Sequence, residues 1–213
     1  MVYHKVHLIV GVIAVVFAVA IVWSFVSKDN PDYNVAIMTE YVLPTDLQLD
    51  LEEHIQQYAD DRNGDGKVVV QLLYYPFLTD SQSEYELAQL QASFVKFAAD
   101  ANAGDTMIFL YDDASYNYLD QNDMDGFFGP VDDSGEEYVL FSDMAGLNNL
   151  QLNHYAEEGD LETVLNVLGS LKVAVRSTDA SVFEKEEIAA YRQDSIALFE
   201  RLKTGEKPQT AAE

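Results

Sequence analysis

Residues 61–75, "DRNGDGKVVVQLLYY", join an acidic, glycine-containing loop to an apolar stretch, and this junction decides the fold. The Asx-Gly pairs at 63–64 and 65–66 are typical of tight turns, because glycine adopts left-handed backbone conformations at little cost. Val, Leu and Tyr then dominate residues 67–75, which predicts a buried strand. Apolar residues at helical spacing over residues 47–59 precede the loop, so the local order is helix, turn, strand.

The same alternation extends in both directions along the chain. Strand-like runs occupy residues 34–38 and 106–111, and a helix is expected up to Ala101, with Ser83 and Glu86 as a capping box at its start. Further elements are expected at 138–141 (strand), 161–170 (helix), 171–177 (strand) and 183–205 (helix). Alternating strands and helices are typical of parallel crossovers. We therefore predict an α/β fold with a mostly parallel, doubly wound sheet of about four to five strands and flanking helices.

An uncharged apolar segment, Leu8–Val26, precedes this domain. Its 19 residues, at about 1.5 Å per residue, nearly cross a hydrocarbon core of about 30 Å. A cleaved signal peptide is the alternative, since Ala18-Val19-Ala20 resembles a cleavage site, but the apolar region of signal peptides is usually shorter. We expect one N-terminal transmembrane helix.

These features predict the organisation of the whole chain. It comprises a short cytoplasmic N-terminus (1–7), a transmembrane helix (8–26), a linker (27–33), an extracytoplasmic α/β domain (34–204) and a flexible tail (205–213). All 37 acidic residues follow the apolar segment, and the formal net charge is −25. Nucleic-acid binding requires a basic surface and is therefore not expected. The expected location is the cell membrane, with the lipid bilayer as a partner through Leu8–Val26 and a second membrane protein as a further candidate.

The loop that begins at Asp61 resembles the first half of a calcium loop. Asp61, Asn63 and Asp65 occupy positions 1, 3 and 5, a glycine follows at position 6, and Lys67 at position 7 offers its backbone carbonyl. Position 12 is Leu72, which is not a ligand. Calcium binding is therefore one interpretation, and a simple turn after a helix is the other.

Two more carboxylates, those of Asp112 and Asp113, directly follow the strand predicted at 106–111. Open α/β sheets bind ligands at the carboxyl ends of their strands, so these two residues are candidates for a binding face. The alternative is an acidic loop exposed to solvent. No cysteine is present, which excludes thiol nucleophiles and disulfides, and no nucleophile-base motif is apparent.

The segments "VAIMTE" (35–40), "LEEHIQQYADDRNGDGKVVVQ" (51–71) and "QASFVKFAADANAGDTMIFLYDD" (91–113) carry a resemblance. In this order they resemble uncharacterised single-span membrane proteins of anaerobic Gram-positive bacteria, whose outer domain is similar to one lobe of the type 2 periplasmic solute-binding fold. The resemblance covers about residues 34–115. It implies one lobe of a binding fold and transfers no ligand-contact residues.

Three functions follow as hypotheses. The leading one is a membrane-anchored, non-enzymatic binding, sensing or accessory module at the cell surface. The second is a metal-assisted hydrolase that uses Asp112, Asp113 and neighbouring carboxylates, and it predicts that these carboxylates converge. The third is a structural or assembly factor, which predicts a broad flat interface instead of a pocket.

Overall fold

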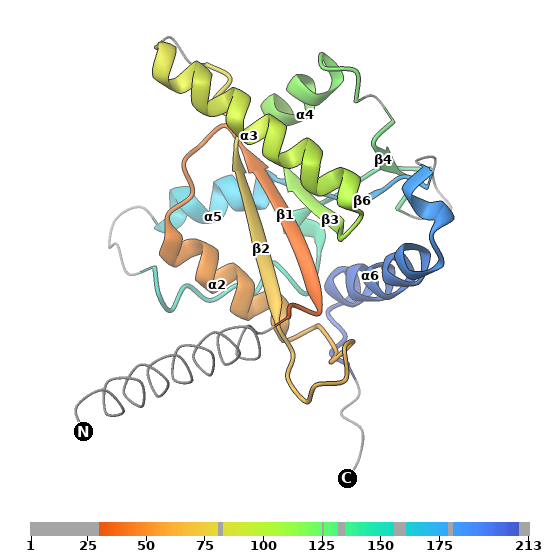
Figure 1. Ribbon diagram of the computed structural model, residues 1–213. Helices are drawn as coiled ribbons and strands as arrows, with labels where there is room; N and C mark the ends of the chain where they lie inside the picture. The colour runs from red at the N-terminus through yellow and green to blue at the C-terminus, as the bar shows by residue number, and fades with distance from the viewer. Residues whose placement is uncertain are drawn as a thin grey trace, which may run out of the picture. The chain divides into compact units, whose positions relative to one another are not determined.

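The structure is a computed structural model that describes residues 30–80, 83–124, 126–131, 135–155, 161–178 and 181–208. The chain divides into two compact units, Met1–Asn30 and Pro31–Glu213. The second unit contains every helix and strand described below (Figure 1).

The prediction of a single-pass membrane protein is corrected. The proposed span, Leu8–Val26, lies outside the described residues. Among the residues that the structure does describe, no helix combines the length and apolarity needed to cross a bilayer. The two longest, α3 (Glu84–Ala103) and α6 (Glu186–Thr204), carry charged side chains along their length. The transmembrane assignment and the extracytoplasmic location are therefore withdrawn.

The described strands form one mixed sheet with the order β2-β1-β3-β6-β4, and β5 also pairs with β6 (Figure 1). Their bounds are β1 Tyr33–Thr39, β2 Val70–Pro76, β3 Thr106–Tyr111, β4 Phe128–Gly129, β5 Val139–Leu140 and β6 Lys172–Arg176. Strand β1 pairs in parallel with β2 and with β3. Strand β6 is antiparallel to β3, β4 and β5.

The prediction of a mostly parallel sheet of about four to five strands is therefore wrong. The described part of the chain contributes six strands, and only the β2-β1 and β1-β3 pairings are parallel. Apolar, β-branched composition identifies a buried strand but contains no information about its direction. The first residue of β6, Lys172, pairs with the last residue of β3, Tyr111, so the long segment between the two strands returns to the end of the sheet where β3 stops, and β6 runs antiparallel.

Helices cover both faces of the sheet, because its strands are apolar on both sides. Helices α2 (Thr45–Gln56), α5 (Leu161–Ser170) and α6 pack on the face that includes Val35 and Ile37. Helices α3 and α4 (Asp113–Asp120) pack on the face that includes Ala36 and Met38. Alternate residues of β1 thus point to opposite cores, as the two-residue period of a strand requires.

Local sequence signals are confirmed where they are strong. The helix predicted at 161–170 and the strand predicted at 106–111 have the bounds of α5 and β3. The Ser83 side chain accepts a hydrogen bond from the Glu86 backbone, and the Glu86 side chain accepts one from the Ser83 backbone, which completes the predicted capping box. Helix α3 ends at Gly104, which has a left-handed conformation (φ 77°).

Candidate ligand-binding site

At the predicted binding face, at the carboxyl ends of the strands, Asp112 and Asp113 both make internal contacts. Asp112 caps α4 by accepting a hydrogen bond from the Ser115 amide (2.8 Å), and its second oxygen accepts one from the Glu40 amide (2.7 Å). Asp113 forms an ion pair with Lys172. The structure thus gives both residues a role in fastening neighbouring segments to the end of the sheet.

The four residues predicted to bind calcium lie in one exposed loop. The carboxylate of Asp61 accepts hydrogen bonds from the amides of residues 64, 65 and 66, at 2.8–3.1 Å. Asn63 accepts one from the Asp65 amide, and Asp65 accepts one from the Lys67 amide, both at 2.9 Å. Within the described ranges, no three or more acidic, His or Cys side chains form a group suited to hold a metal ion. Calcium binding at this loop stays a prediction.

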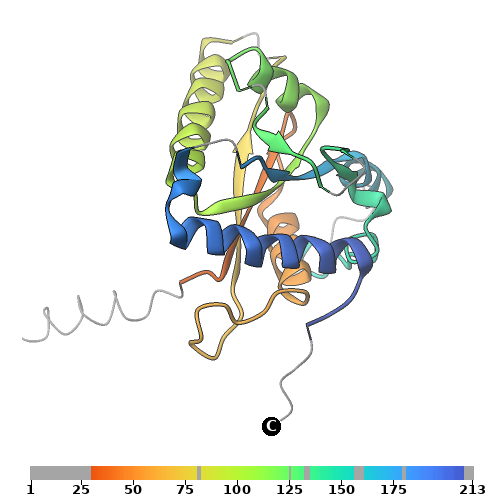
Figure 2. The ribbon, with the colours of Figure 1, turned by 90° about the vertical axis from the view of Figure 1, so that its right-hand side faces the viewer.

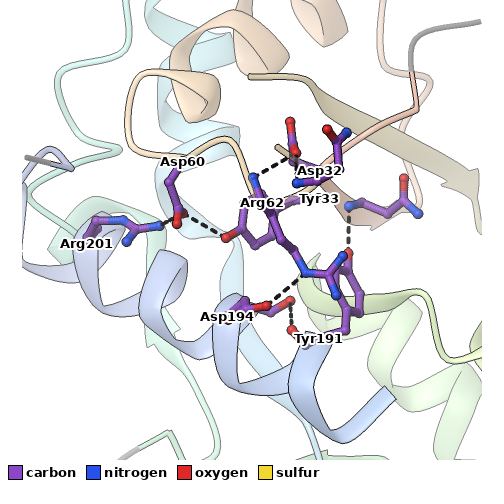
Figure 3. Close-up of polar contacts among 10 residues, drawn as sticks. Asp32, Tyr33, Asp60, Arg62, Tyr191, Asp194 and Arg201 are labelled. Atoms are coloured by element: carbon purple, nitrogen blue, oxygen red, sulfur yellow. Dashed lines mark hydrogen bonds and ion pairs between the residues drawn. The ribbon is translucent and has the colours of Figure 1, made fainter. Parts of the chain in front are cut away.

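A buried carboxylate, that of Asp32, holds this loop against the sheet (Figure 3). Asp32 is only 1% exposed. One of its oxygens accepts hydrogen bonds from the amides of Arg62 and Asn63, both at 2.9 Å, and the other accepts one from the amide of Val69 at 2.8 Å. Both ends of the loop are therefore tied to the residue that precedes β1.

Ion pairs connect the same region to α6 (Figure 3). Asp60 accepts a hydrogen bond from the Tyr33 hydroxyl (2.8 Å) and pairs with Arg201. The Nε of Arg62 donates to Asp194 at 2.9 Å, and the guanidinium carbon lies 4.7 Å from the centre of the Tyr191 ring. Figure 2 shows α6 crossing the sheet near the amino end of β1, above this loop. Two hollows lie beside this network.

The first hollow, here called the α2 pocket, has a volume of about 280 Å³. Its lining is almost entirely polar: Asp50, Glu53, His54, Gln57, Tyr58, Asn149, Gln151, Asn153 and Lys207. These residues come from the second half of α2, the loop before residue 155 and the segment after α6. A polar hollow of this size is a candidate for a small hydrophilic ligand.

Internal partners already occupy the charged groups of the α2 pocket. Asp50 accepts hydrogen bonds from three consecutive backbone amides, those of residues 153–155, each at 2.9 Å. Glu53 pairs with His154 at 3.0 Å, and Lys207 donates to Gln57 at 2.9 Å. The pocket therefore has little charged hydrogen-bonding capacity left for a ligand.

The imidazole ring of His54 in this pocket also has an internal partner. The Nε2 of His54 lies 2.6 Å from the carbonyl oxygen of Gly146, so this nitrogen must carry the proton. Burial lowers the pKa of His54. The neutral ring thus joins α2 to the loop before α5, and its role is architectural.

The second hollow, here called the Arg62 hollow, has a volume of about 230 Å³ and lies at the amino ends of β1 and β3. Its lining consists of Pro31, Asp32, Asn34, Arg62, Ala103, Gly104, Asp105, Glu187, Ile188 and Tyr191. Pieces of four segments thus meet here, and the Asp32 network fixes two of them. Burial raises the pKa of Tyr191 to about 12, so its ring stays neutral beside the Arg62 guanidinium.

In and beside the Arg62 hollow, some hydrogen-bonding groups have no partner among the described residues. The side-chain amide of Asn34 donates to the carbonyl oxygen of Asp105 (3.1 Å), but its own oxygen, Oδ1, is buried and has no hydrogen-bond partner among the described residues. In that same part of the chain, the terminal Nη atoms of Arg62 and the carboxylate of Glu187 also make no hydrogen bond or ion pair. Buried polar groups in proteins are nearly always paired, so Asn34 Oδ1 requires an explanation.

Sequence reasoning missed this hollow completely. Asn34 and Arg62 match no motif, and Asp32 falls within the segment predicted as a linker, 27–33. The available signal was weak: a polar Asn at the start of an otherwise apolar strand, and an Arg inside an acidic loop.

Comparison with known proteins adds no further constraint. No protein family, no curated protein and no solved structure matches this chain. The resemblance to a solute-binding lobe stays a prediction.

Proposed function

We propose that this protein is a non-enzymatic binding domain and that the Arg62 hollow is its ligand site. The observation that carries the proposal is the Arg62 guanidinium, which Asp194 and the Tyr191 ring hold in place while its Nη atoms make no hydrogen bond among the described residues. The unpaired Nη atoms of Arg62 provide donors in the same hollow.

The composition of the hollow favours binding over catalysis. Its described lining contains no Ser, Cys, His or Lys side chain, and the carboxylate of Asp32 is taken up by three backbone amides. The hydrolase hypothesis required carboxylates to converge near Asp112 and Asp113. In the described residues, Asp112 caps a helix and Asp113 pairs with Lys172, so this hypothesis gains no support.

Amide NMR spectra of the full-length chain, recorded with millimolar methylammonium, guanidinium or acetate, test the proposal. At least one probe should shift the side-chain amide signal of Asn34 and the backbone signal of Gly104. The Arg62→Gln variant should weaken the response to acetate, whereas Gln151→Leu in the α2 pocket should leave every response unchanged. If none of the three probes shifts signals from the Arg62 hollow, it is not a ligand site. If signals of the α2 pocket shift instead, the site has been assigned to the wrong hollow.

A further inference from the structure

The outer edge of β2 forms one end of the described sheet (Figure 1). Among the described strands, β2 pairs only with β1. The amide of Leu72, in the middle of β2, points away from β1 and donates to the Oε1 of Glu52, on α2, at 2.8 Å. We infer that Glu52 closes this edge against pairing with β2 of a second copy of the chain. The inference is independent of the proposed ligand site.

The direction of the Leu72 amide fixes which backbone groups of β2 face outward. The N–H and C=O of one residue point to the same side of a strand, and the side alternates along the chain. Phe77 belongs to the inward set and donates to the Thr39 carbonyl of β1 at 2.8 Å, as this alternation requires. The outward groups belong to residues 70, 72, 74 and 76. Because residue 76 is a proline without an N–H, the edge has three outward amides, with that of Leu72 at the centre.

The sequence of this edge favours strand pairing. Residues 68–79, VVVQLLYYPFLT, carry no charge, although 23% of the residues in the chain are charged. Val, Leu and Tyr dominate the run before the proline. Uncharged segments of this composition pair edge to edge when they are left open.

A second copy fits the edge in an antiparallel register. With a two-fold axis at Leu72, the two Leu72 residues face each other, and Val70 faces Tyr74 of the other copy. Each copy then donates all three outward amides to outward carbonyls of its partner. No charged side chains of the strands face each other in this register, so like-charge repulsion is absent there. The strand is therefore complementary to itself, as a two-fold contact requires.

Glu52 blocks the centre of that register. Its carboxylate occupies the amide that would bond at the axis, and it would bring two negative charges together there. The edge is closely covered, since Val70 and Leu72 are only 4% and 7% exposed. A charged side chain that reaches into an edge is one of the ways in which natural sheets prevent edge-to-edge pairing. Pairing of two copies therefore requires that the contact of Glu52 is lost.

A purely structural role for Glu52 predicts a different result. If its carboxylate only satisfied the Leu72 amide, its removal would lower stability and leave the association of the chain unchanged. If it protects the edge, its removal causes self-association through β2. The association state therefore separates the two roles.

Sedimentation equilibrium of the full-length chain measures this association. The runs use about 0.5 M NaCl, because salt screens the repulsion between two chains of net charge −25. Glu52→Ala should strengthen self-association at least about 100-fold over the parent chain. Each of the two copies loses a hydrogen bond to a charged group, which is worth about 10-fold or more in an equilibrium constant. Glu52→Gln keeps an oxygen for the Leu72 amide and should stay close to the parent.

Two further variants keep the test decisive. Glu52→Asp retains the charge but shortens the side chain, so it should release the amide with less effect on folding and associate more strongly than the parent. Glu53→Ala removes the same charge as Glu52→Ala from the next residue of α2, whose carboxylate pairs with His154. It should associate no more strongly than the parent, which controls for net charge.

A second-site change connects the association to β2. Gln71 is exposed, and in the two-fold register the two copies of this residue would lie about 7–8 Å apart on one face of the joined sheet. Adding Gln71→Lys to Glu52→Ala should therefore reverse the association. Hydrogen exchange gives a direct readout, because the outward amides of Val70 and Tyr74 should gain protection in the associated state.

The inference is overturned if Glu52→Ala and Glu52→Asp fold, as judged by circular dichroism, and associate no more strongly than the parent. It also fails if Gln71→Lys does not reverse the association or if the amides of Val70 and Tyr74 gain no protection, since another surface would then be responsible. An equal increase in Glu53→Ala would assign the effect to net charge. A parent chain that already pairs through β2 would show that Glu52 does not close the edge.

Discussion

Replacing Asp32 should cost more stability than any other single change in the amino-end network. Its carboxylate is 1% exposed and accepts three backbone hydrogen bonds at 2.8–2.9 Å, from residues 62, 63 and 69. Asp32→Ala removes all three acceptors in one step. Because the loop amides of residues 62 and 63 regain some contact with water, we use the low end of the usual value, about 1.5 kcal/mol per charged hydrogen bond. The expected loss is about 4–5 kcal/mol.

That loss is large against a typical total stability of about 5–15 kcal/mol. Asp32→Asn keeps one oxygen but turns an NH₂ group toward the remaining donor, so it should lose about 2 kcal/mol. Asp65→Asn is the matched control, since Asp65 is exposed and Asn retains an oxygen for the Lys67 amide. It should change stability by less than about 0.5 kcal/mol.

Urea unfolding followed by circular dichroism measures these differences for the full-length chain. Amide hydrogen exchange gives a second, local readout, because the amides of Arg62, Asn63 and Val69 should lose protection in Asp32→Ala. The reasoning is refuted if Asp32→Ala costs less than about 1 kcal/mol with an unchanged urea slope, or if those three amides exchange as slowly as before.

Three further predictions concern the loop, the core and pH. If the loop binds calcium, millimolar calcium should raise the melting temperature, and the double variant Asp61→Ala, Asp65→Ala should abolish this increase. If calcium does not raise the melting temperature of the unmodified chain, the interpretation of the loop as a simple turn is the one that remains. Gly146→Ala should destabilise by about 1–3 kcal/mol in urea unfolding, because its Cβ would lie 2.7 Å from a backbone oxygen of α6. Gly169→Ala, within α5 and with 3.7 Å to its nearest neighbour, should instead be neutral or stabilise by up to about 1 kcal/mol, and equal losses in both variants would contradict the steric argument. The pKa of His54 is lowered in the folded state, so its contribution to stability is present above about pH 6.5 and is lost as the pH falls toward the folded pKa. His54→Gln should flatten this part of the curve of unfolding free energy against pH. An unchanged curve would contradict the assignment.

Local signals in the sequence were sufficient to locate most elements. β3 and α5 have the predicted bounds because each is a compact apolar or amphipathic run with turn residues at its ends. The capping box at Ser83 and Glu86 was equally predictable, since it depends on residues only three positions apart. Short elements were harder. Helix α4 has eight residues and β4 has two, which is too little for a period to emerge.

Strand direction and long-range polar contacts were outside the reach of such signals. The antiparallel pairing of β6 depends on how the chain returns after β3, and no residue of "KVAVR" encodes it. Asp32 was assigned to a linker because its neighbours are polar. In the fold, its carboxylate accepts hydrogen bonds from three amides that lie 30 to 37 positions further along the chain. A hydrogen bond between distant segments leaves no periodic trace in the sequence.

The carboxylates show why charge alone was a poor guide to the site. Asp112, at one end of the sheet, was a candidate for a binding face, and Asp32, at the other end, was assigned to a linker, yet the oxygens of both accept hydrogen bonds from backbone amides. A carboxylate that already accepts two or three hydrogen bonds has little to offer a ligand. A better guide is which hydrogen-bond donors and acceptors have no partner in the folded chain. By that measure the Arg62 guanidinium, whose Nη atoms have no partner among the described residues, is a better marker of a binding site than either acid.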